Sequence, residues 1–589
     1  MSTTANLETP GGAAAWPAPA LPAHWALGRR HLALCAAFCG LFLYLDYLPV
    51  VHSGTWLHAL QGRWIVANRS LFAADPAQPF TEGMRVTAGS WLSDAILGLV
   101  ERGCGRGAIF HLIAVSGMLL FAMLAWLYRG QTRGWLLPSA GLGMALALGA
   151  NPGRLPLPEV FGLLCLTATL GVVRWLAREE RLPRDCEASP APPGPARGWQ
   201  AWALVGAIQL AWTNLHSSFL IGIAVLGCCA VGRGLQTAWQ TRSPIAVLAD
   251  RSVQRWVLLT EWAALVALAN PYGVRLVINA CAAVANVQVR SSSDWAPLRL
   301  ASFSGLAFLG SLGLLAPILR RSRRPIPWAE AILLSVGVLA VAMTSRALPW
   351  YAVVYVFVVL PHLAAATARR PAREEARRAG PEVGSAAATR RFGWTLTCAV
   401  ALWVTFCISP ISSAWLGRAA CTKRLPGSVL PVAVAERLKQ QAESQVVFAP
   451  LEWADWLAWD QAPKVAAMMT SNVQWVPRKV WLDYQRVLRA EFNWEQVLER
   501  YHVDQVLVQT AQQPELGRQV RLSSRWRVAL DADGALLAVR VREGANRQDA
   551  HGESGEPAAE GSARGHAPAE ISGLAGLALE RRRPWITTR

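Results

Sequence analysis

The chain has 589 residues, of which 53% are hydrophobic and only 16% charged, where about 25% charged is usual for soluble proteins. This composition excludes a disordered chain and argues against a soluble enzyme. A net charge of +19 is compatible with nucleic-acid binding. Whether it indicates such binding depends on where the basic residues lie along the chain. The 11 cysteines contain no CxxC pair, so neither a disulfide framework nor a zinc site is predicted.

Apolar runs that could cross about 30 Å of hydrocarbon recur along the chain. The first is not expected to be a cleavable signal peptide, because thirty residues precede it, it is too long and further runs follow it. We predict about eleven transmembrane helices, near 31–51, 107–128, 135–150, 160–175, 199–212, 217–231, 256–269, 302–319, 328–343, 350–366 and 394–409.

Arginine placement predicts the orientation of these helices. With a cytoplasmic N-terminus, the inside segments hold 24 basic residues and the outside loops of the membrane part hold 10. Counting the apolar run 273–289 as a span would move the cluster RRSRRP (320–325) outside, so we expect this run to be a helix along the outer surface. The inside segments account for +15 of the net charge. The charge therefore indicates topology and attraction to membrane lipids, and no nucleic-acid partner is predicted.

Beyond the last span the character of the sequence changes. Short β-rich runs at 445–450, 504–509, 526–531 and 535–541 alternate with helical stretches, which predicts a small α/β domain. The fold class is thus a polytopic α-helical membrane protein with a C-terminal extracytoplasmic α/β domain. We divide the chain into a cytoplasmic segment 1–30, a transmembrane domain 31–414 with a first outer loop 52–106, the α/β domain 415–543 and a disordered tail 544–589.

Ionisable residues gather at the predicted outer ends of the spans and in the outer loops. Only Glu261 lies well inside a predicted span. A transporter should carry such groups in mid-membrane and show two similar halves with broken spans, and neither pattern is present. The distribution favours an enzyme that works at the outer surface of the membrane.

Several short motifs follow one another in a characteristic order. They are Thr55, Trp56, His58, Gly62 and Ile65 in a TW-x-H…G-x-x-I stretch, then DP…P…EGM…WLS (75–93), NLH (214–216) and NPYG (270–273). In these motifs, and in the pieces 447–460, 494–508 and 525–540, the chain resembles the GT-C superfamily of polyprenyl-phosphate-sugar-dependent glycosyltransferases. The resembling branch is bacterial and is related to protein O-mannosyltransferases and lipid A sugar transferases.

The resemblance implies a protein of the bacterial inner membrane and a polyprenyl-phosphate sugar as donor. The acceptor would be an envelope glycan, lipid or protein at the extracytoplasmic face. One position departs from the pattern, because the aspartate that the superfamily usually places near the end of the first span is replaced by Gly54. Asp46 or Asp75 could substitute for it. The alternative is a catalytically inactive membrane scaffold or lipid-binding protein of envelope assembly.

The expected chemistry selects candidate residues of two kinds. An acceptor hydroxyl needs a carboxylate to take its proton, and the candidates are Asp75, Asp46 and Asp94. The leaving phosphate needs positive charge, which a bound Mg²⁺ or Mn²⁺ could also supply. The candidates for this role are Arg63, Arg85, Arg346, His58 and His216.

Structural roles compete with each of these assignments. Asp75 before Pro76 is a natural turn starter, Asp46 could cap a helix end, and Arg346 could snorkel to the interface. His58 and His216 could be packed histidines. Trp453, Trp456 and Trp459 recur at intervals of three residues, which is more typical of a packing face than of a sugar platform.

Overall fold

The computed structural model describes residues 27–47, 52–81, 84, 86–132, 134–151, 154–181, 196–291, 295–367, 385–415, 432–440 and 445–541. Most of the predicted cytoplasmic segment and the predicted disordered tail lie outside the described residues. The chain divides into two compact units, one formed by Met1–Tyr47 with Arg369–Arg418 and the other by Leu48–Ala368 with Ala419–Arg589.

The first unit is a helical pair with a short appended helix. The hydroxyl of Tyr47 donates to the carbonyl of Ile408 at 2.5 Å, and the thiol of Cys35 donates to the carbonyl of Cys398 at 3.7 Å. Asp46, one of the candidate carboxylates, is fully buried in this unit. The helices are α1 (Arg29–Tyr47), α16 (Ser385–Ile408) and α17 (Pro410–Trp415).

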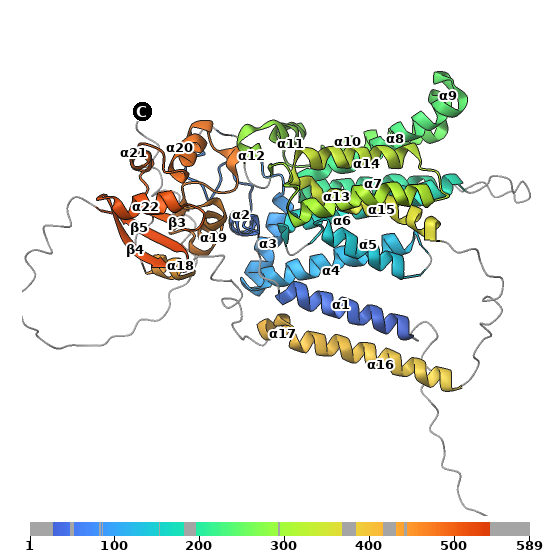
Figure 1. The fold of residues 1–589 in the computed structure, drawn as a ribbon, viewed down its shortest axis with the longest axis horizontal. Helices are drawn as coiled ribbons and strands as arrows, with labels where there is room; N and C mark the ends of the chain where they lie inside the picture. The colour runs from blue at the N-terminus through green and yellow to red at the C-terminus, as the bar shows by residue number, and fades with distance from the viewer. Residues whose placement is uncertain are drawn as a thin grey trace, which may run out of the picture. The chain divides into compact units, whose positions relative to one another are not determined.

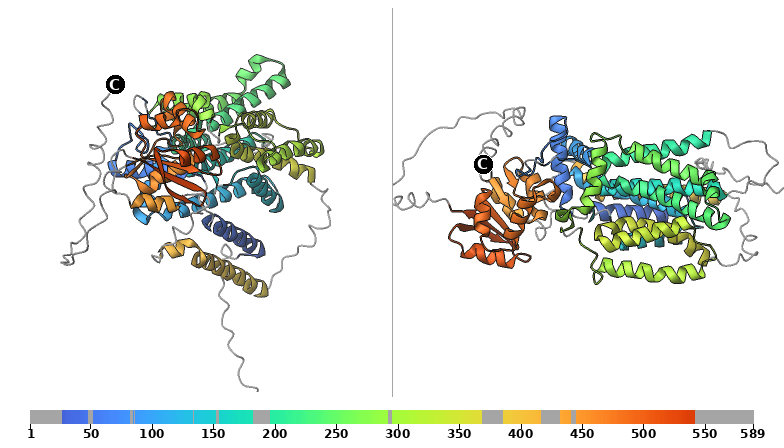
Figure 2. Two further views of the ribbon diagram at one scale, coloured as in Figure 1. Left: turned by 60° about the vertical axis from the view of Figure 1, so that its left-hand side comes forward. Right: turned by 90° about the horizontal axis from the view of Figure 1, so that it is seen from above.

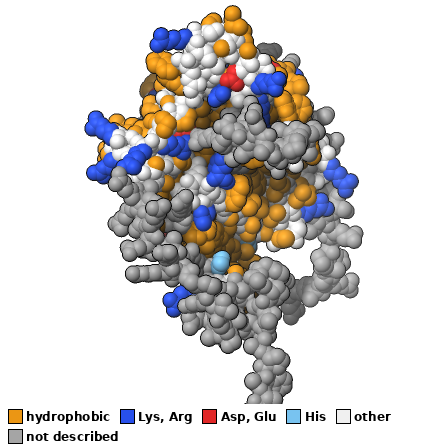
Figure 3. Space-filling model, turned by 90° about the vertical axis from the view of Figure 1, so that its right-hand side faces the viewer, with side chains coloured by type: hydrophobic (Ala, Val, Ile, Leu, Met, Phe, Trp, Pro, Cys, Tyr) orange, Lys and Arg blue, Asp and Glu red, His pale blue; other side chains and the backbone are white. Residues whose placement is uncertain are grey.

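The second unit contains a bundle of helices with a sheet domain at one end (Figure 1). Arginines such as Arg242 and Arg251 flank the short helix α9 at the far end of the bundle, where basic side chains lie among apolar ones (Figure 3). The helices are α2 (Gly54–Asn68), α3 (Trp91–Cys104), α4 (Ala108–Arg129), α5 (Leu136–Ala147), α6 (Leu157–Arg181), α7 (Ala196–Leu215), α8 (Leu220–Thr241), α9 (Pro244–Ala249), α10 (Arg251–Val266), α11 (Val274–Ala285), α12 (Val287–Arg290), α13 (Phe303–Arg321), α14 (Trp328–Met343) and α15 (Leu348–Thr367).

All eleven predicted spans fall on helices of the two units. Within the described residues, five helical stretches are long and apolar enough to cross a membrane, and the others are shorter or less apolar. The membrane-protein class is thus supported, whereas the count of about eleven spans is not confirmed. The five stretches are Ala108–Arg129, Leu157–Glu179, Ser217–Thr241, Phe303–Arg321 and Ser345–Thr367.

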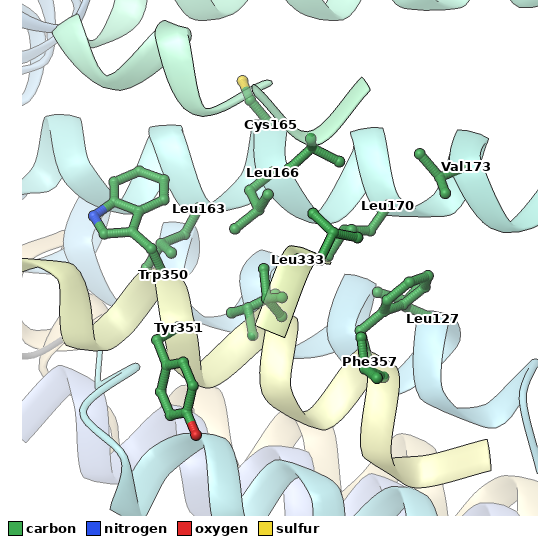
Figure 4. Close-up of a cluster of buried hydrophobic side chains, with 14 of the residues drawn as sticks. Leu127, Leu163, Cys165, Leu166, Leu170, Val173, Leu333, Trp350, Tyr351 and Phe357 are labelled. Carbon is green, nitrogen blue, oxygen red and sulfur yellow. The ribbon is translucent and has the colours of Figure 1, made fainter. Parts of the chain in front are cut away.

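Helix α15 forms the centre of the bundle. Its run of valines and aromatic residues is buried on every side from Leu348 to Leu360. It packs against α5, α13 and α14. Tyr351 lies against Phe308 of α13, with ring centres 5.2 Å apart, and Phe357 lies beside Leu127 of α4 (Figure 4). A helix that is apolar all round suits such a central position.

The run that we excluded from the spans forms two short helices. Helices α11 and α12 meet at Asn286, which has extended backbone and whose side chain accepts from the N–H of Gln288 at 2.8 Å. The run is broken at Asn286 into helices of 12 and 4 residues, in agreement with its exclusion as one continuous span. Its place on the outer surface remains a prediction.

The sheet domain has five strands in the order β2-β1-β3-β5-β4. β1 pairs with β2 and β3 in parallel, while β5 pairs antiparallel with β3 and β4. Asp533 and Gly534 both have positive φ and form the tight β4–β5 turn, for which an Asp-Gly pair is well suited. The strands are β1 (Gln445–Phe448), β2 (Val465–Ala467), β3 (Gln505–Gln509), β4 (Trp526–Ala532) and β5 (Ala535–Arg540).

Four of these strands confirm the predicted β-rich runs, and β2 was not predicted because three residues carry no alternating pattern. Helices accompany the sheet (Figure 2). They are α18 (Val432–Lys439), α19 (Leu451–Gln461), α20 (Arg478–Leu488), α21 (Trp494–Arg500) and α22 (Pro514–Leu522).

Helix α19 joins the sheet domain to α2 and α3. The ring of Trp459 packs on that of Trp56 with centroids 4.7 Å apart, and Arg63 and Arg106 lie over the Trp459 ring. The three tryptophans of α19 are all buried, as expected for a packing face. The sheet domain is therefore held firmly beside the first outer loop of the predicted topology.

Candidate functional site

A cavity of about 700 Å³ lies in the second unit between the bundle, the α2–α3 pair and the sheet domain. One part of its wall is polar and carries both charged and neutral donors. The polar lining comprises His52, His58, Gln61, Thr87, Ser90, Asp94, His216, Ser217, Ser218, Asn279, Asn286, Thr344, Arg346, Ser471, Asn472 and Gln474.

The remainder of the wall is an apolar groove between α8, α11, α14 and α15. Small and branched apolar residues make up most of this part of the wall. Its lining includes Leu220, Ile221, Ala224, Val225, Leu276, Ala280, Ala283, Leu333, Val336, Gly337, Ala340 and Val354.

Two glycines bring His58 and Asp94 together. A Cβ on Gly62 would lie 1.8 Å from the carbonyl oxygen of Asp94, and one on Gly98 would lie 2.3 Å from the backbone of Gly62. The backbones of α2 and α3 can touch only because both positions lack a side chain. His58 and Asp94 each precede one of these glycines by four residues, and their Nδ1 and Oδ1 atoms are 2.7 Å apart.

The Asp94 carboxyl lines the cavity while only 1% of its surface is exposed. Burial raises the pKa of Asp94, and the adjacent His58 opposes this rise. The pair therefore places a carboxyl with enhanced proton affinity at the cavity wall.

His216 is fixed as a neutral imidazole beside the pair. Its Nδ1 accepts from the Ser218 hydroxyl at 2.7 Å and from the Ser218 N–H at 3.3 Å. Burial lowers the pKa of His216 well below its usual range, and the positive charge of Arg346 adds to the effect. With Nδ1 occupied as an acceptor, the ring proton resides on Nε2 as a hydrogen-bond donor.

Aromatic stacking holds this imidazole in place. The Trp350 ring stacks on the rings of His216 and Trp212, with centroid distances of 6.1 and 6.2 Å. Gly162 makes the space, since a Cβ there would approach Trp350 to 2.6 Å.

Arg346 brings positive charge to the cavity from the short η5 turn (Ser345–Ala347) between α14 and α15. Its guanidinium lies 3.7 Å from Glu159 and 5.4 Å from the centre of the Trp295 ring. About a third of the side chain is exposed, so the charge remains available to a ligand.

Asp75 lies one layer behind the cavity. Its Oδ1 accepts from the Ala77 N–H at 2.9 Å, which is the turn expected of an aspartate before proline, and its Oδ2 accepts from Asn472 at 3.1 Å. Burial raises the pKa of Asp75 to about 6, although these hydrogen bonds oppose the rise. Asp75 is therefore linked to the cavity through Asn472 and Gln61, which both line it.

The other candidates from the sequence are placed elsewhere. Arg63 is paired with Glu101 at 2.6 Å and contacts Trp459, and it does not line the cavity. Asp46 belongs to the first unit, and Arg85 lies outside the described residues. The structure thus brings His58, Asp94, His216 and Arg346 together around one cavity.

Part of the site was not predicted from the sequence. Ser471, Asn472 and Gln474 of the sheet domain line the cavity, as does His52. The ring of His52 lies 3.2 Å from where a Cβ on Gly54 would be, and its Nδ1 accepts from the Gly54 N–H. No motif in the sequence marks the segment from Ser471 to Gln474, because it forms a loop whose role depends on domain packing.

The described residues do not form an evident metal centre. No group of three or more His, Cys, Asp or Glu side chains among them could hold a metal ion. The one carboxylate in the described lining, Asp94, is already bound to His58. This does not match the oxygen-rich ligand sets that Mg²⁺ and Mn²⁺ prefer, so we derive no step through a metal.

No protein-family model matches the sequence, and no curated protein is significantly similar to it. Solved structures are similar to it at low identity. The oligosaccharyltransferase of Archaeoglobus fulgidus shares 12% identity over 82% of this chain and 69% of its own, with a TM-score of 0.45. ArnT of Cupriavidus metallidurans, bound to undecaprenyl phosphate, shares 14% over 88% and 99%, with a TM-score of 0.45.

The mycobacterial arabinofuranosyltransferase AftD shares 14% identity over 87% of this chain and 40% of its own, with a TM-score of 0.45. These neighbours are GT-C glycosyltransferases, the superfamily that the sequence motifs resemble.

Proposed function

We propose that this chain is a membrane glycosyltransferase that moves a sugar from a polyprenyl-phosphate carrier to a cell-envelope acceptor. The reaction takes place at the extracytoplasmic face of the bacterial inner membrane. The supporting observation is that one cavity joins a polar end bearing Arg346, His216 and His58 to an apolar groove between bundle helices. A polyprenyl phosphate has the same two parts, a long apolar chain and an anionic head.

The apolar groove suits the lipid chain of the carrier. Ala224 on α8, Ala280 on α11 and Gly337 on α14 leave room beside the branched side chains of the same helices. An isoprenoid chain in this groove would bury apolar surface. Each Å² buried would stabilise binding by about 25 cal/mol.

The polar end suits the phosphate of the carrier. Arg346 supplies a permanent positive charge, and His216 supplies a neutral Nε2–H donor held by its stack on Trp350. When the bond between the sugar and the phosphate breaks, negative charge grows on the phosphate oxygens. Donors that are already oriented stabilise this charge without reorganisation.

Asp94 and His58 suit the role of general base. The acceptor hydroxyl gives its proton to the Asp94 carboxylate as its oxygen bonds to the anomeric carbon, while the carbon–oxygen bond to the phosphate breaks. A pKa raised by burial makes the carboxylate a better proton acceptor than an exposed aspartate. His58 donates to Asp94 and fixes its orientation.

The inactive scaffold remains the second candidate, and the surroundings of Gly54 favour it. The His52 ring occupies the space into which a side chain at position 54 would extend. If catalysis required a carboxylate at that position, the chain could bind the carrier without turning it over.

Carrier binding tests the part of the proposal that both candidates share. Full-length protein in lipid nanodiscs would be titrated with undecaprenyl phosphate and, as a matched control, with undecaprenol, which lacks the phosphate. We expect tighter binding of the phosphate, with most of the difference lost in Arg346→Gln. Equal binding of the two lipids by the wild-type protein would overturn the proposal.

Turnover separates the enzyme from the scaffold. Membranes containing the protein would be incubated with sugar-bearing undecaprenyl phosphates and envelope extract, and released undecaprenyl phosphate would be measured. The enzyme predicts release that Asp94→Asn abolishes. Carrier binding without any release, in the wild-type protein, supports the scaffold instead.

A further inference from the structure

The segment from Thr470 to Val476 of the sheet domain forms one wall of the cavity and is fixed from three directions. Gln78 donates to the Thr470 hydroxyl, and Gln288 of α12 donates to the carbonyls of Val473 and Val476 at 3.2 and 3.3 Å. From within the sheet domain, the buried Asp455 accepts from the Ser471 N–H at 2.9 Å. A loop held in this way presents a fixed surface to the cavity.

Within this wall, a chain of hydrogen bonds leads from Asp75 to the cavity. The Asn472 amide donates to Asp75 Oδ2 at 3.1 Å, which fixes its Nδ2 on the far side of the wall. Its Oδ1 then faces Gln474, whose Nε2 donates to it at 3.4 Å. Both amides line the cavity, and Gln474 is half-buried.

The sugar of the proposed carrier needs polar partners in the same cavity. With the lipid chain between α8, α11 and α14 and the phosphate beside Arg346, the sugar extends from the phosphate away from the groove. The polar lining that remains for the sugar includes Ser471, Asn472 and Gln474 of the sheet domain. A carboxamide both donates and accepts hydrogen bonds, which matches a sugar hydroxyl.

We propose that Gln474 contacts the sugar of the donor and sets sugar preference, with Asn472 and Asp75 as positioning residues that act through it. This inference rests on the proposed function. It assigns the sheet domain to donor selection. It also gives Asp75 a role distinct from that of a catalytic base.

The test compares binding of carriers with and without a sugar. Full-length protein in nanodiscs would be titrated with undecaprenyl phosphate and with undecaprenyl phosphates bearing a hexose, a pentose or an amino sugar. We expect the wild-type protein to bind at least one of these carriers more tightly than the bare phosphate. Gln474→Ala should reduce that preference roughly three- to tenfold, the size of one lost hydrogen bond, and leave binding of the bare carrier unchanged.

Matched variants separate this role from general damage. Gln512→Ala removes an exposed glutamine of the same domain and should leave the preference intact. Asp75→Asn and Asn472→Ser should lower the preference as Gln474→Ala does, and Gln474→Glu should restore part of it. A structural role alone would lower the stability of the protein without changing the ratio of the two affinities.

The outcomes distinguish this inference from the proposed function. If the wild-type protein does not bind undecaprenyl phosphate better than undecaprenol, both the proposed function and the inference about Gln474 are wrong. Binding of the bare carrier together with an unchanged sugar preference in Gln474→Ala would remove the inference alone. A loss of affinity that is equal for bare and sugar-bearing carriers would also remove it, because the residue would then contact the phosphate or support the fold.

Discussion

His58 Nδ1 lies 2.7 Å from Asp94 Oδ1, and both residues precede by four positions the glycines at which α2 and α3 touch. The contact is set by two missing side chains, because any Cβ at Gly62 or Gly98 would force the helices apart. The acid–base geometry at the cavity thus depends on backbone packing as well as on the two side chains. This relationship leads to the first of five predictions.

Asp94→Asn should abolish sugar transfer while carrier binding persists. The amide is nearly isosteric but cannot take a proton, so we expect turnover to fall by about 10²- to 10⁴-fold. Binding of undecaprenyl phosphate should stay within about twofold of the wild-type value, a difference of less than ~0.5 kcal/mol. Asp533→Asn, in the exposed β4–β5 turn, is the matched control. Turnover by Asp94→Asn at the wild-type rate would exclude this carboxylate as the base.

Arg346→Gln should weaken binding of the carrier phosphate. A hydrogen bond to a charged group contributes about 1.5–3 kcal/mol, so we expect the Kd to rise by roughly one to two orders of magnitude. Arg346→Lys should recover only part of this affinity, because lysine lacks the planar fork and the stack on Trp295. Arg299→Gln, at an exposed arginine, provides the comparison. Similar affinities for both glutamine variants would show that Arg346 does not contact the phosphate.

Gly162→Ala should disturb the aromatic stack behind His216. The added methyl group would approach Trp350 to 2.6 Å and the Ser218 hydroxyl to 2.9 Å, so we expect a loss of about 1–3 kcal/mol in stability and reduced turnover. Gly143→Ala adds the same methyl group to α5, where nothing lies within 4 Å. Thermal unfolding of the two full-length variants in detergent provides the measurement. Equal melting temperatures would contradict the close packing at Gly162.

The contributions of Asp75 and Asp455 to the stability of the chain should fall as the pH rises from about 4 to 6. Burial raises the pKa of both Asp75 and Asp455 to about 6, above the value of about 4 in an unfolded chain. The folded state therefore binds more protons than the unfolded state in this window. Across it, the contribution of each group to the free energy of unfolding falls by up to about 3 kcal/mol. The change should level off above about pH 7.

Thermal unfolding of the full chain between pH 4 and 8 tests this expectation. In Asp455→Asn the side chain no longer titrates, so the pH dependence should be visibly smaller than in the wild-type protein. Asp533→Asn, an exposed change, should leave the pH dependence as it is. An identical pH profile for Asp455→Asn and the wild-type protein would contradict the buried, titrating carboxyl.

Ala224→Trp should fill the apolar groove and exclude the lipid chain. Ala224 lies on α8 in the groove wall, whereas Leu258 on α10 is exposed outside it, so Leu258→Trp adds an indole without blocking the groove. We expect undecaprenyl phosphate to bind at least about tenfold more weakly to the first variant, a change of about 1.4 kcal/mol, and normally to the second. Full affinity in Ala224→Trp would place the lipid elsewhere.

Much of the architecture follows from local patterns in the sequence. The apolar runs predicted helices at all eleven positions, and alternating residues predicted four of the five strands. The break at Asn286 agrees with the exclusion of the run 273–289 from the spans. These features depend on the periodicity of neighbouring residues, which a sequence displays directly.

The sequence also predicted candidate site residues, but it could not show which of them meet at one site. His58, Asp94, His216 and Arg346 line the cavity, whereas Arg63 is used in an ion pair with Glu101 and Asp75 lies behind Asn472. Gln474 carried no signal at all. Which side chains meet depends on contacts across hundreds of residues, such as the approach of α2 to α3 at Gly62 and the docking of α19 on Trp56. Those contacts arise from the packing of distant surfaces, and only the tertiary structure decides them.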